Sequence, residues 1–426
     1  MHLSAKSNAV ACREGGVRTR FLYATAETHP TYRADVRVLF GKYLPELGIE
    51  TDLVALSPRT TELPPWGGGR LLCRRFGSSI GFVIADIAQQ LSLIWHCFRG
   101  YDGLIVRDKP LLGIIGLFAA RLARIPFVYW MSFPMPEAYL TIARDRSIHR
   151  RRRLYAWLRG QIGSCALYRI MVPLSDFLFV QSPVMLEQLR GKSLSPTRAL
   201  PVPMGVDVSA LPEYPKATIA EATFRRPSAV YLGTLSPLRR AELELMIDAA
   251  KLVGEVRPDF LLLVIGEADT EGEKGWLRRY AEAHRAAQWV RFLGWLPYDE
   301  GLAHAQTCAI GLSPFPRGEL FDSASPTKTI EYMSLGLPVV CNNQPDQADV
   351  IEQSGGGLCV PLTPSAFASA ILELLSDPKR AQAMGKAGQA WVSENRDYRR
   401  LSGMVAGVLR SLCSDQLQGD WRQRAS

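Results

Sequence analysis

The sequence lacks the features that mark a membrane-spanning or secreted protein. An uncharged apolar run at 111–120 reaches about half of the ~18 residues that a spanning helix needs, and no other run is long enough. Residues 1–17 contain no apolar core of signal-peptide length, and we expect them to form a flexible tail. These absences predict a protein that does not cross a membrane.

Cysteine is scarce, and signatures for metals and dinucleotides are missing. Eight cysteines are scattered without a C-x-x-C pair. This pattern predicts free thiols in a reducing cytoplasm and argues against a zinc site or disulfide framework. No D-x-D pair stands in a context that would hold a metal, so we expect neither metal nor cofactor. After the first predicted strand the sequence reads ATAETHPTY, without G-x-G-x-x-G, which makes a Rossmann oxidoreductase a weak alternative.

Positive charge is concentrated in the first half of the chain. The whole sequence has 50 basic and 41 acidic residues, a net charge of +9. Residues 1–205 hold 27 basic and 14 acidic groups, whereas 206–426 hold 23 and 27. The basic half is expected to meet an anionic partner such as a membrane surface or a phosphorylated lipid. No recognised nucleic-acid module accompanies the charge, so we do not expect nucleic acid.

Short runs of strand-forming residues alternate with helical patterns along most of the chain. This alternation is typical of βαβ units and predicts an α/β fold with parallel sheets. A proline-rich segment near 200–212 separates two such halves. We expect two doubly wound domains, at 18–205 and 206–395, facing each other across a crevice at the carboxyl ends of their strands. In 396–426, an amphipathic helix near 399–412 is expected to return to the first domain.

The same patterns give approximate element bounds. The predicted strands are Arg20–Ala24, Thr51–Ala55, Leu71–Arg75, Gly103–Arg107, Phe127–Met131, Phe177–Gln181, Ala229–Leu232, Leu261–Ile265, Val290–Leu293, Ala309–Ser313, Pro338–Cys341 and Gly357–Val360. The predicted helices are Ala34–Leu47, Ile80–Phe98, Leu111–Ala123, 237–253, 273–287, 326–335 and 365–376.

A segment of the second half, SPTKTIEYMSLGLPVVCNN, carries the strongest chemical signal. Ser325 and Pro326 predict a helix start, because serine is a good N-cap and proline suits the first helical position. The free amides of Thr327 and Lys328, with the Lys328 ammonium, predict an anion site facing the crevice. Glu331 lies one turn further on, where its carboxylate can accept hydrogen bonds from two ribose hydroxyls. The alternative is an ordinary surface helix with a solvated Lys–Glu pair.

A second segment, AVYLGTLSPLRR, predicts a strand, a tight loop and a helix start. Gly233 ends the strand, and its missing side chain lets backbone approach a diphosphate beside Thr234. Ser236-Pro237 again predicts an N-cap and first turn. Arg239 has a fixed charge and a fork of donors that fit phosphate oxygens, and Arg240 is the second candidate. Two solvated arginines on a helix face are the alternative.

These segments resemble the donor-binding region of family 4 glycosyltransferases, and the resemblance covers most of 18–412. It includes FLLLVIGEA, VRFLGWLP and GLSPF, and VPMGVD at the junction, where the family has V-P-N-G-V-D. The resemblance implies the GT-B fold, with two Rossmann-like domains, and transfer from a nucleotide sugar with retention of configuration and without a metal. It also implies that Arg239 contacts the departing diphosphate, and that loops at Gly266 and Gly294 approach the nucleobase and donor sugar.

Two positions depart from the family pattern. The first acid of the family's E-x7-E motif would stand eight residues before Glu331, where this chain has Ser323. Many members have a histidine after the strand that here reads PFVYWMS, and the matching residue is Ser132. These departures leave the acidic contact to the donor sugar and the catalytic side chain unassigned.

The first domain is expected to bind the acceptor, with polar residues at the ends of three strands around the crevice. His29 can act on an acceptor hydroxyl, although a lone loop histidine can equally be structural or solvated. Arg107 and Asp108 can face the crevice or form a local salt bridge. The acceptor-side candidates are Glu27, His29, Tyr32, Arg33, Arg107, Asp108, Ser132 and Glu137.

The segment RSIHRRRRLYAWLRGQIG combines arginines with an apolar stripe. On a helix this pattern is typical of segments that lie at a membrane interface. We therefore expect Arg150–Arg153 to contact an anionic membrane surface, with a core-facing helix and a solvated basic side as the alternative.

Together these features predict a glycosyltransferase (hexosyltransferase type) in which Arg239, Lys328 and Glu331 are the central site residues. The donor is expected to be a nucleotide-diphosphate sugar, with UDP favoured, and the acceptor a membrane-linked saccharide or lipid of cell-surface or exopolysaccharide synthesis. The expected location is the cytoplasm, peripherally attached to the inner face of the plasma membrane. A nucleotide-sugar 2-epimerase of the same architecture and a non-catalytic nucleotide- or glycan-binding homologue are the alternatives.

Overall fold

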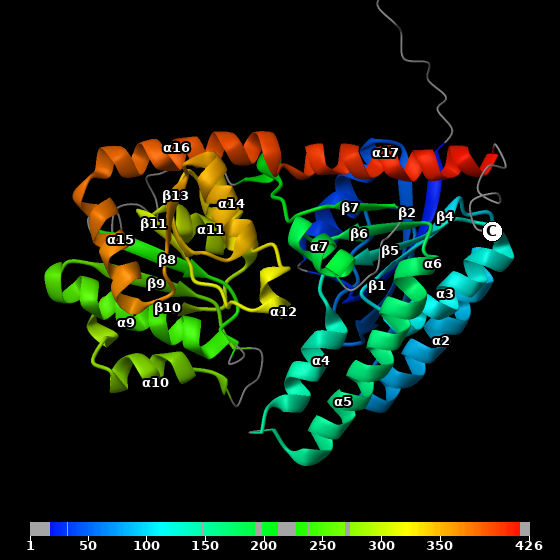
Figure 1. Ribbon diagram of the computed structural model, residues 1–426, viewed down its shortest axis with the longest axis horizontal. Coiled ribbons are helices and arrows are strands. Elements are labelled where there is room, and N and C mark those ends of the chain that lie inside the picture. The colour runs from blue at the N-terminus through cyan, green and yellow to red at the C-terminus, as the bar shows by residue number, and fades with distance from the viewer. Residues whose placement is uncertain are drawn as a thin grey trace, which may run out of the picture.

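Two α/β domains, each built on one parallel sheet, lie side by side in the computed structural model (Figure 1). The structure describes residues 18–31, 33–146, 148–191, 198–211, 227–236, 239–268 and 273–417, apart from the side chains at 111 and 415–417. The tail predicted at 1–17 and the predicted roles of Tyr32 and Pro237 fall outside these residues.

The sheet of the first domain has seven strands. They are β1 (Thr19–Thr28), β2 (Ile49–Pro58), β3 (Leu71–Phe76), β4 (Gly103–Arg107), β5 (Phe127–Met131), β6 (Phe177–Val180) and β7 (Ala199–Pro201). Their order is β3-β2-β1-β4-β5-β6-β7, and every neighbouring pair is parallel. The chain adds strands to one side of β1 and then to the other, so the strand order reverses between β1 and β4. Such a reversal opens a crevice at the carboxyl ends of the strands.

Helices cover both faces of this sheet. They are η1 (Asp35–Tyr43, π-helical), α1 (Leu44–Glu46), α2 (Ser79–Cys97), α3 (Pro110–Ala123), α4 (Met135–Arg144), α5 (Arg150–Ser164), η2 (Cys165–Met171, π-helical), α6 (Val172–Leu174) and α7 (Pro183–Gly191). One core joins η1 to strand side chains such as Tyr23 and Trp130. The other core, on the opposite face of the sheet, joins α2, α3, η2 and α7 to the strand side chains that point to that face, such as Leu22 and Tyr129. Because successive strand residues point to opposite faces, strands covered on both faces read as continuous apolar runs.

The second domain repeats the design with six strands. They are β8 (Ser228–Leu232), β9 (Leu261–Ile265), β10 (Val290–Gly294), β11 (Ile310–Ser313), β12 (Val339–Asn342) and β13 (Gly357–Val360), in the parallel order β10-β9-β8-β11-β12-β13. Its helices are α9 (Arg240–Val256), α10 (Trp276–Ala283), η6 (Ala287–Trp289), α11 (Tyr298–Gln306), α12 (Glu319–Asp322), α13 (Thr327–Ser334), α14 (Pro345–Ser354), α15 (Pro364–Ser376) and α16 (Pro378–Asn395). Two cores, one on each face of the sheet, hold them.

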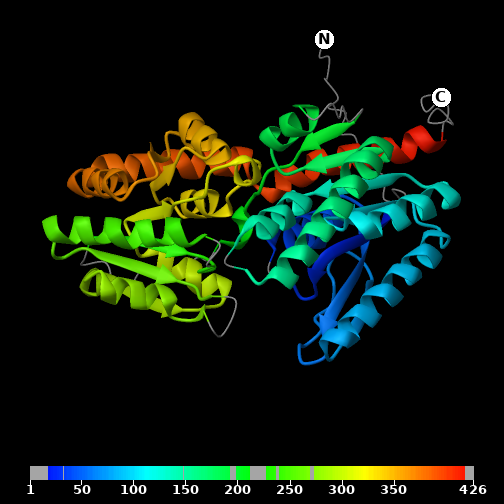
Figure 2. The same cartoon turned by 60° about the horizontal axis from the view of Figure 1, so that its bottom comes forward.

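The last helix, α17 (Tyr398–Leu417), crosses back to the first domain. Figure 1 shows α16 and α17 running nearly end to end along one edge, from one domain to the other, and Figure 2 shows the same crossing from another side. Tyr398, Val405 and Leu409 are fully buried in the core that also contains Phe21 of β1. The C-terminal residues therefore complete the N-terminal domain.

The predicted fold class is confirmed, and most strands begin and end within a residue or two of their predicted bounds. The sequence patterns missed β7, a three-residue edge strand that ends at Pro201, and the helices α4, η2, α7, α11, α14 and α16. The predicted helix at 273–287 is shorter, because Gly275, in the left-handed region at φ 70°, precedes its first turn.

Candidate active site

A cavity of about 580 Å³ separates the two domains at the carboxyl ends of both sheets. From the first domain it is lined by Arg33, Ala34 and Arg37 after β1, Ser132 and Phe133 after β5, and Gln181 after β6. The linker contributes Met204. From the second domain it is lined by Arg239, Trp295, Pro297, Tyr298, Asp299, Phe315, Ala324, Ser325, Pro326, Thr327, Lys328 and Glu331.

The start of α13 forms one corner of this cavity. Thr327 is its first helical residue and Pro326 its N-cap, so the first-turn amides of Thr327 and Lys328 have no acceptor within the helix. The Lys328 ammonium lies 5.3 Å from the centre of the Tyr231 ring. A Cβ at Gly233, whose φ is 151°, would come within 2.5 Å of Lys328 Cε. A side chain here would adopt a strained backbone conformation and would displace the end of Lys328, so glycine suits this position.

Arg239, which directly precedes α9, brings a second cation to the same cavity. Its Nη2 donates to the carbonyl oxygen of Pro314 at 3.0 Å, and its guanidinium lies 4.8 Å from the centre of the Phe315 ring. Its buried Nε has no hydrogen-bond partner within the part of the chain that the structure describes. Neither Arg239 nor Lys328 forms an ion pair with any residue that the structure describes, so both retain hydrogen-bonding capacity for an anion.

Burial and crowding shift the protonation of this corner. Desolvation and the nearby Arg239 charge lower the pKa of Lys328 to about 7, although Glu331 acts in the opposite direction. Burial raises the pKa of Glu331, while Lys328 and the Tyr298 hydroxyl act to lower it. Tyr298 donates to Glu331 Oε1 at 3.0 Å and so fixes the carboxylate. An anion bound here would favour the charged form of Lys328.

Ser325 has a different role from the predicted one. Its hydroxyl donates to Asp346 Oδ2 at 2.7 Å and accepts from the Met204 amide at 3.0 Å. Arg396 completes this cluster with a 2.8 Å ion pair to Asp346. The prediction of Ser325 as the N-cap is wrong, because its side chain turns away from α13 to join the linker. Pro326, predicted at the first helical position, is the N-cap instead.

Most of the other donor-side candidates lie near the cavity without lining it. Gly266 (φ 138°) and Gly294 (φ 75°) line a separate small pocket of about 20 Å³ together with Glu267 and Phe292. Thr234 is exposed in the loop after β8. Arg240 does not reach the cavity: it is exposed, pairs with Glu244 at 3.5 Å and lies over Trp276.

On the acceptor side, Arg33 and Ser132 line the cavity at the two ends of a buried charge network. Arg33 Nε lies 3.2 Å from Asp35, and Arg107 lies 2.7 Å from the other oxygen of Asp35. Arg107 Nε is also 3.3 Å from Asp108, which accepts hydrogen bonds from the amide and hydroxyl of Ser132. Burial opposes the charge on Asp35, but Arg107 and Arg33 outweigh it and lower the Asp35 pKa.

Five of the predicted acceptor-side residues do not line the cavity: Glu27, His29, Arg107, Asp108 and Glu137. His29 is buried, and its Nε2 is 2.9 Å from the carbonyl oxygen of Pro64. Arg107 is 1% exposed and is enclosed by Asp35 and Asp108. These corrections share one cause: each polar side chain bonds to residues within the first domain instead of facing the cavity.

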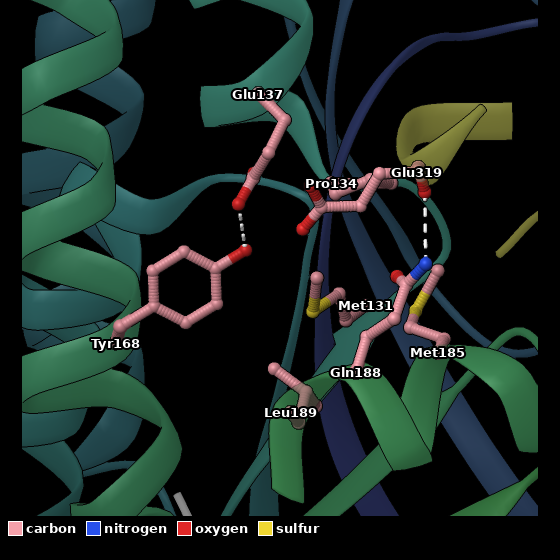
Figure 3. A pocket seen from close by; sticks show the side chains of 8 residues that line it. All are labelled: Met131, Pro134, Glu137, Tyr168, Met185, Gln188, Leu189 and Glu319. Atoms are coloured by element: carbon pink, nitrogen blue, oxygen red, sulfur yellow. Dashed lines mark hydrogen bonds between the residues drawn. The ribbon is translucent and has the colours of Figure 1, made fainter. Parts of the chain in front are cut away.

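Glu137 is another of these residues, and Figure 3 shows it in a small pocket between the domains. There it accepts a hydrogen bond from Tyr168, while Gln188 donates to the Glu319 carbonyl at 2.9 Å. Glu27 is half-buried, 3.8 Å from Arg33, and also does not line the cavity.

The residue in place of the family's first acid faces away from the cavity. Ser323 is fully buried, and its hydroxyl donates to the Leu320 carbonyl. Its own carbonyl accepts from Ser182 of the first domain at 2.7 Å. Asp322, one residue earlier, pairs with Arg317 at 2.7 Å. Ser323 therefore serves the domain interface.

Several cavity residues were missed. Arg37 carried no positional signal, since it lies nine residues beyond β1 and within η1. Tyr298 carried only a positional signal, because it stands four residues after the end of β10. Phe133 and Gln181 are likewise the first residues beyond their strands, or nearly so. Among the residues that the structure describes, no group of three or more His, Cys, Asp or Glu side chains has the arrangement of a metal site.

Two parallel-sheet domains that face each other across a cavity are the arrangement of the GT-B fold. Residues 226–377, which span most of the second domain, match the family described as "Glycosyl transferases group 1".

Two curated relatives extend this similarity to the sequence of known enzymes. A GDP-mannose-dependent monoacylated alpha-(1-6)-phosphatidylinositol monomannoside mannosyltransferase of Corynebacterium glutamicum is 27% identical over 216 residues, which are 49% of this chain and 55% of that protein. A GDP-mannose-dependent alpha-(1-6)-phosphatidylinositol monomannoside mannosyltransferase of Mycobacterium tuberculosis is 30% identical over 217 residues, again 49% and 55%. The chain thus spans about half the length of these curated relatives.

Solved structures match nearly the whole chain. Sucrose-phosphate synthase from Thermosynechococcus elongatus superposes with a TM-score of 0.67 at 18% identity, covering 93% of this chain and 100% of that one. Anabaena HepE in complex with UDP-glucose gives a TM-score of 0.66 at 15% identity, covering 92% and 99%. At these identities the likeness establishes the GT-B fold alone.

Proposed function

We propose that this protein is a glycosyltransferase that moves a sugar from a nucleoside-diphosphate sugar to a hydroxyl of a membrane-linked saccharide or lipid. One observation carries the proposal: Arg239 and Lys328, two cations without an ion-pair partner among the described residues, converge on the interdomain cavity beside the first turn of α13. A diphosphate supplies the negative charge that this corner lacks.

The proposed chemistry follows from the leaving group. The bond between the sugar's anomeric carbon and the terminal phosphate oxygen breaks, and its electron pair leaves with the nucleoside diphosphate. A new bond forms from the acceptor oxygen to the same carbon, and the acceptor's proton is released. Arg239 and Lys328 stabilise the charge that grows on the diphosphate, which is the use of preorganised donors that most accelerates such reactions. Glu331, held by Tyr298, accepts hydrogen bonds from the ribose hydroxyls.

The donor's base and the stereochemistry belong to the proposal as well. We retain a UDP-sugar as the first donor to test and add GDP-mannose, because the curated relatives are named for it. Retention of configuration and independence from metal follow from the resemblance to family 4. A role in cell-surface or exopolysaccharide synthesis remains part of the same proposal.

The acceptor is proposed to reside in the membrane. The protein would attach peripherally to the inner face of the plasma membrane, with Arg150–Arg153 of α5 near anionic headgroups. Arg150, Arg151 and Arg152 are exposed, which makes their charges accessible to lipid phosphates.

A two-stage experiment tests the proposal. Thermal-shift measurements with UDP-, GDP- and ADP-sugars identify the donor, and transfer from that donor is then measured with a membrane extract as acceptor. Arg239→Ala and Glu331→Ala should each lose about 10²-fold or more in rate with the fold intact. Arg257→Ala is the control, because this exposed arginine at the far end of α9 pairs only with Asp259 among the described residues. Wild-type rates from both site variants would refute the assignment.

The same assay separates the alternatives. A new epimer formed from a UDP-sugar without acceptor would indicate a 2-epimerase. Donor binding without transfer to any extract would indicate a non-catalytic homologue.

A further inference from the structure

Large apolar side chains are exposed mainly on one side of the first domain. They lie on three helices, α2, α3 and α5, rather than scattered over the surface. Contiguous exposed apolar surface of this kind marks a contact with a protein or a membrane. The residues are Ile80, Phe82, Val83, Ile84, Ile87, Leu91 and Trp95 of α2, Phe118 and Leu122 of α3, and Leu154, Tyr155, Trp157, Leu158 and Ile162 of α5.

Helix α2 is apolar on two opposite sides. Leu93 and Cys97, four residues apart, are buried against the sheet. On the outer side, Ile84, Ile87 and Leu91 recur at helical spacing and are 62%, 54% and 62% exposed. A helix that only covered a sheet would be polar on its outer side, so this stripe needs a separate explanation.

By length and composition alone, α2 could cross a membrane. Its inner side nevertheless belongs to the fold: Gln89 donates to the Leu72 carbonyl of β3 at 2.6 Å, and Leu93 is fully buried. A spanning orientation would break these contacts. The arrangement suits a helix that lies along a membrane surface, with one side on the protein and the other in the lipid.

The three helices share one layer of the domain. Helix α2 packs on α3, and α3 packs on η2, the continuation of α5. Gly113 of α3 allows the second contact, because a Cβ there would lie 2.4 Å from the Met171 side chain. Figures 1 and 2 show these helices on the same side of the first domain. Side chains from distant parts of the sequence therefore form one surface.

The charge of this surface has one sign. Helices α3 and α5 contain no acidic residue, and α2 contains only Asp86, which pairs with Lys109 at 3.1 Å. Arg150, Arg151 and Arg152 of α5 are exposed and form no ion pair with the residues that the structure describes. Apolar side chains flanked by uncompensated arginines complement anionic headgroups above acyl chains. The exposed rings of Trp95, Tyr155 and Trp157 suit the interface between the headgroups and the acyl chains.

We propose that α2, α3 and α5 form a docking face for a bilayer that contains anionic lipid. The outer side chains of α2 and α3 enter the boundary between headgroups and acyl chains, and the α5 arginines lie among the headgroup phosphates. The docking face deepens the proposed function, and rests on it for the claim that the acceptor is in the membrane. In this proposal α2 and α3 make the main hydrophobic contact with the bilayer, in addition to the electrostatic contact made by Arg150–Arg153 of α5.

The docking face is connected to the cavity by one helix. Ser132 and Phe133 line the cavity, and α4 begins two residues later and packs on α5. A second interdomain cavity, of about 440 Å³, lies along α4 and is lined by Leu140 and Arg144 opposite Phe321. An acceptor held in the bilayer would thus approach the site along α4.

Vesicle sedimentation tests the docking face. The full chain should pellet with phosphatidylcholine vesicles that contain phosphatidylglycerol, and more weakly with phosphatidylcholine alone. Ile84→Glu with Leu91→Glu should reduce the bound fraction about tenfold or more, because two charges would have to enter the apolar boundary. The control carries the same chemistry on the second domain, Leu252→Glu with Val256→Glu, since both side chains are exposed on α9. It should bind as the unaltered protein does.

A second measurement needs no substitution. Amide hydrogen exchange in 80–98 and 112–122 should slow when vesicles are added, while exchange in α9 should not. Unchanged exchange, or vesicle binding that survives both α2 charges, would overturn the proposal. So would a dimer that the α2 charges convert to monomers, since the face would then join two copies of the chain.

Failure of the docking face can be distinguished from failure of the proposed function. The α2 variant should keep its thermal shift with the donor, because no substituted residue lines the 580 Å³ cavity. Vesicle binding without any donor response would contradict the transferase proposal and leave the docking face intact.

Discussion

Lys328 lies where its positive charge is poorly solvated and where Arg239 repels it. Its pKa of about 7 means that near neutrality the free protein is a mixture of charged and neutral forms. A bound diphosphate reverses the balance, because its negative charge favours the ammonium form. Ligand binding is thereby linked to proton uptake.

We predict that binding of a UDP-sugar, whose phosphates do not titrate in this range, takes up roughly one proton at pH 8 and almost none at pH 5.5. The sign follows from the shift: above pH 7 the free lysine is mostly neutral and must gain a proton, and below it the proton is already present. Calorimetry in buffers of different ionisation enthalpy measures this number. Lys328→Arg is the matched variant, because its guanidinium stays charged and the uptake should disappear. Equal proton uptake by the unaltered protein and the Lys328→Arg variant would show that a group other than Lys328 takes up the proton.

Arg107 is the residue on which the acceptor-side charge network depends. It is buried between Asp35 and Asp108, at 2.7 Å and 3.3 Å. Arg107→Met should lower the free energy of unfolding by about 3–5 kcal/mol, because it leaves a buried carboxylate without its partner. The control is Arg18→Met, which removes an ion pair to Glu50 that is largely exposed and should cost less than about 1 kcal/mol. Urea denaturation measures the free energy of unfolding of both variants. Equal decreases in the two variants would show that the buried network stabilises the fold no more than an exposed ion pair does.

At the scale of elements, the donor corner depends on how closely two loops approach. A Cβ at Gly266 would lie 2.0 Å from the Gly233 carbonyl oxygen, and Gly233 in turn lies beneath Lys328. The loop after β9 can therefore approach the Gly233 backbone only if position 266 lacks a side chain.

Gly266→Ala should destabilise the protein by roughly 1–3 kcal/mol or more, because the loops must separate, and it should weaken donor binding by displacing Lys328. Gly294→Ala is the matched control. Its φ is 75° and a Cβ there meets nothing within 4 Å, so only the backbone cost of about 1 kcal/mol is expected. Urea denaturation and UDP titration measure the two effects. Indistinguishable variants would show that the loops have room to separate.

Elements with strong local patterns were predictable, and those defined by distant contacts were not. The strand Gly103–Arg107 follows from a short continuous apolar run, and the C-terminal helix from apolar residues at helical spacing. Ser325 was misjudged because its partners Asp346 and Met204 are remote in sequence. Arg107 likewise looked like a crevice residue until the fold brought Asp35 beside it. Local propensity gives the element, whereas the direction of a polar side chain depends on neighbours that only the fold supplies.

At the scale of the whole molecule, the two domains are joined at several independent places. Ser182 bonds to the Ser323 carbonyl, and Gln188 to the Glu319 carbonyl. Arg396 holds the linker carbonyl of Met204 as well as Asp346. Directly after Arg396, the chain enters the first domain as α17. The core of the first domain therefore includes residues of α17, and this helix starts at the edge of the second domain.

This dependence gives a prediction that connects the two ends of the chain. Leu409 of α17 is fully buried in the core that contains Phe21 and Tyr43 of the first domain. Leu409→Ala should lower the free energy of unfolding by about 2–5 kcal/mol, because it leaves a cavity in that core. Hydrogen exchange should locate the loss in β1 and η1, far away in sequence, and leave α9 protected. Met404→Ala, on the same helix but 41% exposed, should change little. If Leu409→Ala instead loosened only α17 itself, the helix would be an attachment to the first domain and its core would be complete without it.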